Sequence, residues 1–294
     1  MTKTGYLSSE YAHALSHVGV PIELVNSGAW LLDRPIPNTS HHDLTSPYPF
    51  LCCQRWSSLA DDIPKFQHDF VSLVVVTSPF HGPSLSDLST FDFSRPYKDH
   101  FVTYLDRPCV SSHHTRDATK ALKQVEVEVC AKPTAWTRDW TNLYDNLIAR
   151  HNIQGVTKFS YASLERQLAV PGAVLIRTSK ENRTTCMLLW YVQDNVAYYH
   201  LGASSDEGYQ LQSSYAAFWA SIAFFRGQVE ALSLGAGAGA ECDGSDGLSR
   251  FKKGWSNGTL KTYLCGKVLN QERYEELSAG RDTDFFPAYR EWVA

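Results

Sequence analysis

The chain has 294 residues, 43% of them hydrophobic and 20% charged, with a formal net charge of −4 and an isoelectric point near 6.2. This composition is that of a globular protein rather than a disordered one. It argues against a dedicated nucleic-acid-binding protein, whose binding domain is usually strongly basic. The longest apolar run, residues 71–76, is too short to span a bilayer.

Cysteine and histidine usage points to no metal site. The seven cysteines form no Cys-x-x-Cys pair, and no signal peptide precedes them, so we expect free thiols in a cytoplasmic protein without a membrane partner. The adjacent histidines in His41-His42-Asp43 and His113-His114 are poorly placed to bind one ion together, and no third ligand is spaced to help. We therefore expect no bound metal.

The first half of the chain gives an incomplete set of elements. Up to about residue 70 the sequence is rich in Pro, Ser and His, and its pattern places only a short helix that begins after Ser8 and Ser9. Beyond that point periodicity and capping residues predict strands and helices in alternation. The expected strands are Val71–Thr77, Phe101–Leu105 and the half-exposed Val125–Val129, and the expected helices are Thr115–Gln124, Trp136–His151 and Ser160–Leu168.

The second half has a clearer pattern, and we expect a domain boundary that divides the chain into residues 1–165 and 166–294. Three strands separated by short turns should form an antiparallel meander, and a crossover helix should make the next strand parallel to the third. The expected order is strands Ala173–Thr178, Thr185–Val192 and Val196–Leu201, a loop Gly202–Tyr209, a helix Leu211–Phe225, strands Ala231–Leu234 and Leu260–Cys265, and a helix Gln271–Leu277. This order predicts an α+β fold with a mixed sheet flanked by helices.

Three segments of the second half carry a family resemblance. They are Tyr199–Ser204, Leu232–Gly235 and Asp246–Trp255, the last of which contains Phe251-Lys252-Lys253-Gly254-Trp255. Together they resemble the Fem-type peptidyltransferases of the Gcn5-related N-acetyltransferase (GNAT) superfamily. The resemblance is convincing over residues 170–267, fainter over 100–170 and loose before that.

The resemblance implies two tandem GNAT-like domains, of which the first is degenerate, with a cleft between them. It also implies transfer of an activated acyl or aminoacyl group to an amine of a small molecule or peptide. The donor would be a co-substrate, either acyl-CoA or aminoacyl-tRNA, and no cofactor would be tightly bound. The sequence leaves the acyl group, the acceptor and the oligomeric state open.

One departure from the superfamily bears on the donor. Members that use acetyl-CoA usually hold its pyrophosphate on a Gly-rich turn before the central helix. Here the corresponding turn, residues 203–209, contains Asp206 and Glu207, whose negative charges oppose a pyrophosphate. This favours aminoacyl-tRNA as the donor, although the acidic isoelectric point argues the other way.

Three residues are the candidate catalytic groups, because aminolysis needs a donor or cation for the oxyanion and a route for the amine proton. Lys252 occupies the lysine of the family's Phe-Lys element, and it could instead be a solvated member of a basic run. His200 lies on the third strand and titrates in the range of a base, or it is a hydrogen-bonded core histidine. Asp246 could orient the ammonium or accept its proton, as could Asp243, or both could cap the loop.

A further set of residues is expected to contact the donor or acceptor. The aromatic members could stack a base or ring, or simply pack in the core, and the glycines could let a substrate approach closely, or form a flexible loop. The set comprises Phe251, Arg250, Lys253, Trp255, Gly235, Gly237, Gly239, Ser204, Tyr198, Tyr209 and Arg116.

The leading hypothesis is a Fem-type N-acyltransferase that uses aminoacyl-tRNA or an acyl donor. The first alternative is an acetyl-CoA-dependent N-acetyltransferase that holds CoA in another way. The second is a non-catalytic binding module on the same fold. The intact Phe251-Lys252 pair favours an enzyme over the binding module.

Overall fold

The computed structural model describes residues 4–238 and 246–290. The chain forms two compact units that are each discontinuous in sequence. The first unit consists of Met1–Ala14 with Asp99–Leu260, and the second of Leu15–Lys98 with Lys261–Ala294. The expected boundary at 165/166 falls inside the first unit, and the division into domains stays a prediction.

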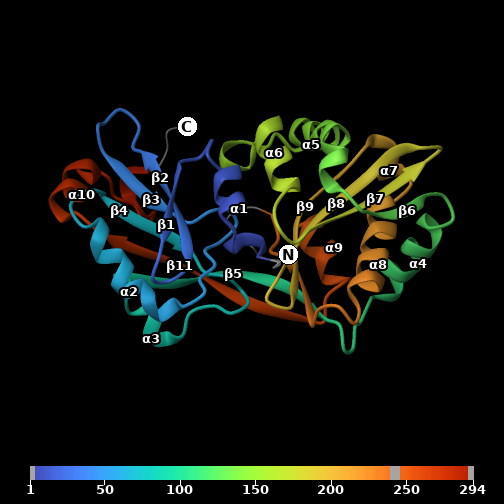
Figure 1. Ribbon diagram of the computed structural model, residues 1–294, viewed down its shortest axis with the longest axis horizontal. Coiled ribbons are helices and arrows are strands. Elements are labelled where there is room, and N and C mark those ends of the chain that lie inside the picture. The colour runs from blue at the N-terminus through green and yellow to red at the C-terminus, as the bar shows by residue number, and fades with distance from the viewer. Residues whose placement is uncertain (1–3, 239–245, 291–294) are drawn as a thin grey trace. The chain divides into compact units, whose positions relative to one another are not determined.

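The first unit has a six-stranded mixed sheet in the order β5-β10-β9-β8-β7-β6 (Figure 1). Strands β7, β8 and β9 form the expected antiparallel meander, β10 is parallel to β9 as expected, and β5 is antiparallel to β10. The strands are β5 Phe93–Tyr104, β6 Glu126–Cys130, β7 Ala173–Lys180, β8 Arg183–Gln193, β9 Val196–Ser204 and β10 Ala231–Gly235. The helices are α1 Ser9–Ala14, α4 Ser112–Ala121, α5 Thr137–His151, α6 Tyr161–Leu168, α7 Asp206–Gln210, α8 Ser213–Phe225 and α9 Gly247–Lys253.

The second unit has a five-stranded mixed sheet in the order β1-β2-β3-β4-β11. Strands β1, β2 and β3 are an antiparallel meander, β4 is parallel to β3, and β11 is antiparallel to β4. The strands are β1 Val20–Leu24, β2 Ala29–Pro35, β3 His42–Thr45, β4 Ser72–Val76 and β11 Gly258–Val268. The helices are α2 Leu59–Asp62, α3 Leu85–Leu88 and α10 Gln271–Ser278.

The two units therefore share one strand plan: a three-stranded meander, a parallel neighbour, and an antiparallel strand after it. The last strand of each plan is exchanged along the chain, since β5 follows β4 but pairs with β10, and β11 follows β10 but pairs with β4. The crossover before β10 is the long helix α8, whereas the crossover before β4 contains only the four-residue helix α2 and short 3-10 turns. The α+β fold with a mixed sheet and a reduced first copy is confirmed.

Helices cover both faces of the first unit's sheet (Figure 1). On one face, α8 packs Phe218 and Phe225 against Trp190 of β8, and this core includes the fully buried Trp255. On the other face, α1, α5 and α6 cover residues such as Tyr191, whose hydroxyl donates to the Gln167 carbonyl. A helix on each face explains why β8 is buried along almost its whole length.

Most predicted elements of the second half are confirmed, but one expectation is wrong and one helix was not predicted. The segment Gly202–Tyr209 is not a loop, because β9 continues to Ser204 and Ser205 caps α7, its Oγ accepting from the Gly208 N–H. The segment that contains Phe251-Lys252 is helix α9, which the pattern did not predict. No helix in the described parts of the chain is long and apolar enough to cross a membrane.

Candidate functional site

Lys252 lies where two parallel strands of the first unit stop pairing. The β9–β10 pairs run from Val196↔Ala231 to Tyr198↔Ser233, and beyond them β9 continues while β10 ends at Gly235. The Lys252 side chain, from α9, is buried, and its Nζ donates to the Ala236 carbonyl at 2.7 Å. The same Nζ lies 5.7 Å from the ring centroid of Tyr199 on β9. The Lys252 ammonium is therefore buried beside the Ala236 carbonyl, one residue past the end of β10.

The chain between β10 and α9 is shaped by two glycines. Gly235 has φ +77°, and a Cβ there would come within 3.0 Å of the Lys252 Nζ. A Cβ at Gly237 would lie 2.0 Å from the Ser249 Oγ and 2.7 Å from Asp246. Both glycines thus let the chain pass close to α9. Gly239 and Asp243 lie outside the described residues.

Asp246 is the N-cap of α9. Its Oδ1 accepts from the backbone N–H groups of Leu248 and Ser249, each at 2.9 Å. Hydrogen bonds, above all that from the Ser249 hydroxyl, hold the pKa of Asp246 below its usual value. A carboxylate with a lowered pKa and engaged oxygens is a weak base, so the structure gives Asp246 the part of positioning α9.

Aromatic packing fixes the other side of α9. Phe251 is half-buried and meets Phe218 and Tyr215 edge-on, at centroid distances of 5.0 Å and 5.1 Å. Trp255 is fully buried and stacks on Phe218 at 5.7 Å, so its ring is core rather than a stacking surface for a base. The exposed Arg250 and Lys253 flank the buried Lys252 on the solvent side of α9.

His114 is a further residue of this region that the sequence interpretation missed. Its Nδ1 and Nε2 lie 2.9 Å from the Ser111 Oγ and the Phe251 carbonyl, and its burial lowers its pKa. A Cβ on Gly254 would lie 2.1 Å from the His114 ring, so only glycine fits there. Helix α4 therefore clamps the C-terminal end of α9 through a neutral imidazole.

His200 is on the opposite face of the sheet from Lys252. Tyr199 meets Phe218 of α8 at 4.9 Å, whereas His200 stacks on Tyr191 at 4.6 Å and packs against Tyr6. The His200 ring nitrogens lie 3.0 Å from the Tyr6 hydroxyl and 2.9 Å from the Gln167 Oε1. Burial lowers the pKa of His200 to about 3. Its neighbour Tyr198 is also buried on this face, so neither residue is brought to Lys252.

The burial of a neutral His200 predicts how the free energy of unfolding changes at acidic pH. The pKa of His200 is lower in the folded state than the value near 6.5 of the unfolded state. Its contribution to the free energy of unfolding is therefore complete above pH 6.5 and is lost as the pH falls towards 3. Between pH 7 and pH 5 the wild type should lose about 2 kcal/mol more unfolding free energy than His200→Gln. Urea unfolding at the two pH values measures this, and equal losses in both proteins would contradict the assignment.

The remaining candidates lie away from Lys252. Near α7, Asp206 pairs with Arg150 at 3.2 Å, and the Arg150 guanidinium covers the Tyr209 ring at 4.1 Å. Glu207 pairs with Arg183 and Lys180, and Ser204 is buried at the end of β9. Arg116 is exposed on α4 and pairs with Asp117.

Gly235 and Gly227 offer a matched pair of substitutions, because both have φ +77° and only Gly235 adjoins Lys252. Either change to Ala should cost about 1–2 kcal/mol of stability through the left-handed backbone. Only Gly235→Ala should also displace the Lys252 ammonium and lower any turnover of the protein. Parallel thermal unfolding and rate measurements check this, and equal rates in the two variants would remove Gly235 from the site.

No protein-family model matches the sequence, and no curated protein matches it. In structure, the chain shares its fold with several solved proteins. It is similar to FemX, with 13% identity, a TM-score of 0.68, and coverage of 91% of this chain and 93% of FemX. It is also similar to the C-terminal domain of a putative lysylphosphatidylglycerol synthetase from Agrobacterium fabrum (13% identity, TM-score 0.64, 90% and 88% covered). L-PGS from Bacillus licheniformis gives a TM-score of 0.61 at 11% identity, with 90% and 92% covered. At sequence identities of 11–13%, these structural similarities establish the fold alone.

Proposed function

We propose that the chain is an acyltransferase that moves an activated aminoacyl or acyl group to an amine of a small molecule or peptide. The observation that carries this proposal is the buried Lys252 ammonium at the point where β9 and β10 stop pairing. A cation held in a site of low water content stabilises negative charge far better than one in bulk solvent.

The reaction requires the protein mainly to hold the donor and the amine close together and to stabilise negative charge. The neutral amine attacks the carbonyl carbon of the donor ester or thioester, the C–N bond forms, and the carbonyl oxygen becomes an oxyanion. The Lys252 ammonium stabilises that oxyanion, or the oxygen or sulfur that leaves when the tetrahedral intermediate collapses. The amine proton passes to solvent, because Asp246 has a lowered pKa and His200 lies on the opposite face.

Aminoacyl-tRNA is the donor that we favour. The name lysylphosphatidylglycerol synthetase describes a protein that joins an amino acid to another molecule, and that protein shares this fold. At the turn where CoA would be held, the Ser205 side chain already caps α7, and Asp206 and Glu207 fill its first turn. Exposed Arg250 and Lys253 beside Lys252 are suited to phosphates. Use of charged tRNA would place the protein in the cytoplasm, where its six described cysteines can remain free thiols.

The test compares binding of acetyl-CoA with binding of a pool of charged tRNAs to the purified protein at two salt concentrations. We expect charged tRNA to bind in a salt-sensitive way, since each phosphate contact adds to the salt dependence, and acetyl-CoA not to bind. Tight binding of acetyl-CoA alone would identify an acyl-CoA enzyme instead. If the protein bound neither donor, the result would favour the alternative that the chain is a non-catalytic binding module.

A further inference from the structure

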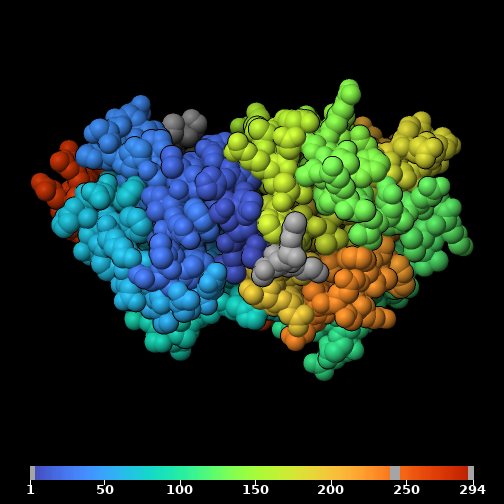
Figure 2. All heavy atoms as spheres, in the orientation of Figure 1, coloured from blue at the N-terminus to red at the C-terminus, as the bar shows by residue number. Residues whose placement is uncertain are grey.

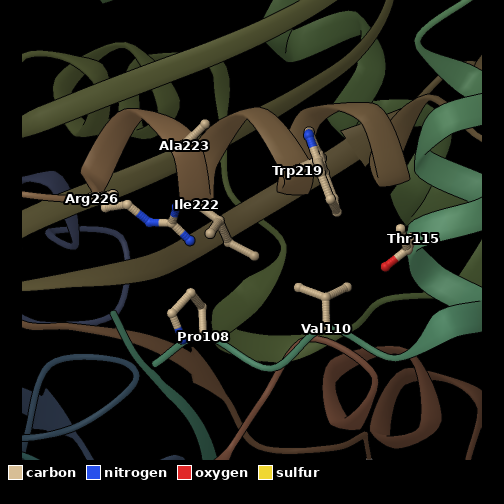
Figure 3. Close-up of a pocket in the computed structure, with 7 residues that line it drawn as sticks. All are labelled: Pro108, Val110, Thr115, Trp219, Ile222, Ala223 and Arg226. Atoms are coloured by element: carbon tan, nitrogen blue, oxygen red, sulfur yellow. The ribbon is translucent and has the colours of Figure 1, made fainter. Parts of the chain in front are cut away.

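A cavity opens beside α8 (Figure 3). It has a volume of about 230 Å³ and lies between the C-terminal half of α8 and the segment that leads into α4. Figure 2 shows α8, in orange, at the surface of this part of the first unit. The residues that line the cavity are Pro108, Val110, Thr115, Trp219, Ile222, Ala223 and Arg226.

The cavity shares no residue with the Lys252 site. Ile222 is part of the buried core between α8 and the sheet, and Val110 packs against that core. Phe218 and the fully buried Trp255 belong to the same core. Side chains of the packed core therefore form part of the cavity wall, and an occupant there would contact α8 through Ile222.

The walls are apolar between two polar residues at opposite ends, Thr115 and Arg226, and Arg226 projects beside Ile222 and Pro108 (Figure 3). Thr115 is the other polar residue, and its hydroxyl donates to the Ser111 carbonyl at 3.1 Å. Among the described residues, Arg226 forms no ion pair and no side-chain hydrogen bond. The positive charge of Arg226 interacts favourably with the dipole of α8, at whose C-terminal end it lies. That interaction does not explain why an apolar cavity lies beside the guanidinium.

The size and charge of the cavity define the occupant. It is smaller than the roughly 300–1,000 Å³ of most small-molecule sites, so only a small molecule fits. A guanidinium presents paired N–H donors that match a carboxylate, and the walls suit a short hydrocarbon chain. We propose that this cavity binds a small monocarboxylate with a short alkyl chain, its carboxylate on Arg226 and its chain between Trp219 and Val110.

The test measures binding of hexanoate to the full chain by ligand-observed NMR and calorimetry, with hexanamide as the neutral isostere. We expect a Kd for hexanoate on the order of 1 mM and binding of hexanamide about tenfold weaker or more. Arg226→Met should weaken hexanoate about tenfold and leave hexanamide unchanged. Lys123→Met, an exposed cation on the loop after α4, should change neither.

A local readout comes from Cys109, which is exposed between two lining residues, while the other five described cysteines are buried. Hexanoate should slow alkylation of Cys109, as followed by mass spectrometry, in the wild type and not in Arg226→Met. The inference is overturned if hexanoate at about 10 mM, roughly ten times the expected Kd, shows no binding. It is overturned equally if Arg226→Met binds hexanoate as well as the wild type does.

Discussion

Replacing Lys252 by Met should lower kcat/KM for acyl transfer by about 100-fold or more. Met has a similar length and fills the same buried space, but it removes the ammonium that lies at the Ala236 carbonyl and the Tyr199 ring. Loss of one preorganised donor to an oxyanion typically costs about 10²–10³ in rate. The measurement is the rate of product formation with saturating donor and with the amine acceptor well below its KM, for wild type and variant side by side.

The control for this substitution is Lys123→Met, which removes an exposed lysine far along the sequence from α9. It should leave kcat/KM unchanged. Circular dichroism and thermal unfolding should show that Lys252→Met remains folded, because Met is apolar in a buried position. A folded Lys252→Met variant with the wild-type rate would remove Lys252 from the chemistry.

Replacing Asp43 by Asn should destabilise the second unit by about 3–5 kcal/mol. The Asp43 carboxylate is fully buried, and it accepts from Arg34 at 3.1 Å, from Arg290 at 2.9 Å and from the Tyr289 hydroxyl at 3.1 Å. Removing one partner of a buried ion pair leaves the other charge uncompensated. Here the two guanidinium groups would face each other without the anion between them.

Hydrogen exchange and thermal unfolding measure this effect. Asp43→Asn should lose backbone protection in β2 and β3, while β8 of the first unit keeps its protection. Asp106→Asn is the control, because the Asp106 side chain is 74% exposed and its change should cost less than about 0.5 kcal/mol. Wild-type protection of β2 and β3 in Asp43→Asn would show that the Asp43 network does not stabilise the second unit.

The sheet of the first unit could be predicted because its signals are local. Strands β7, β8 and β9 are apolar runs separated by tight turns, and the residues at two of these turns, Asn182 and Asn195, adopt positive φ. Helix α8 ends at Phe225, as expected, two residues before Gly227, which has φ +77°. The strands of the second unit were harder to predict, since β1 and β3 are short and only partly buried, and the apolar run in β2 covers only residues 29–32.

The candidate site was harder to predict, because it depends on which face of the sheet each residue occupies. Alternation along β9 separates Tyr199 from His200, but with helices on both faces the sequence does not tell which side borders Lys252. Helix α9 is short and polar, and its formation rests on the Asp246 cap and on the packing of Phe251 and Trp255. Such tertiary support leaves no periodic signal in seven residues.

The most direct test of the central claim follows a labelled aminoacyl group from tRNA into a mixture of small amines and peptides. The wild-type protein should produce a labelled amide, and Lys252→Met should produce it at least about 100-fold more slowly. A parallel reaction with labelled acyl-CoA shows whether the donor was assigned correctly. If both donors remain intact over many equivalents of protein, or if Lys252→Met reacts as fast as the wild type, the proposed acyl transfer at Lys252 is wrong.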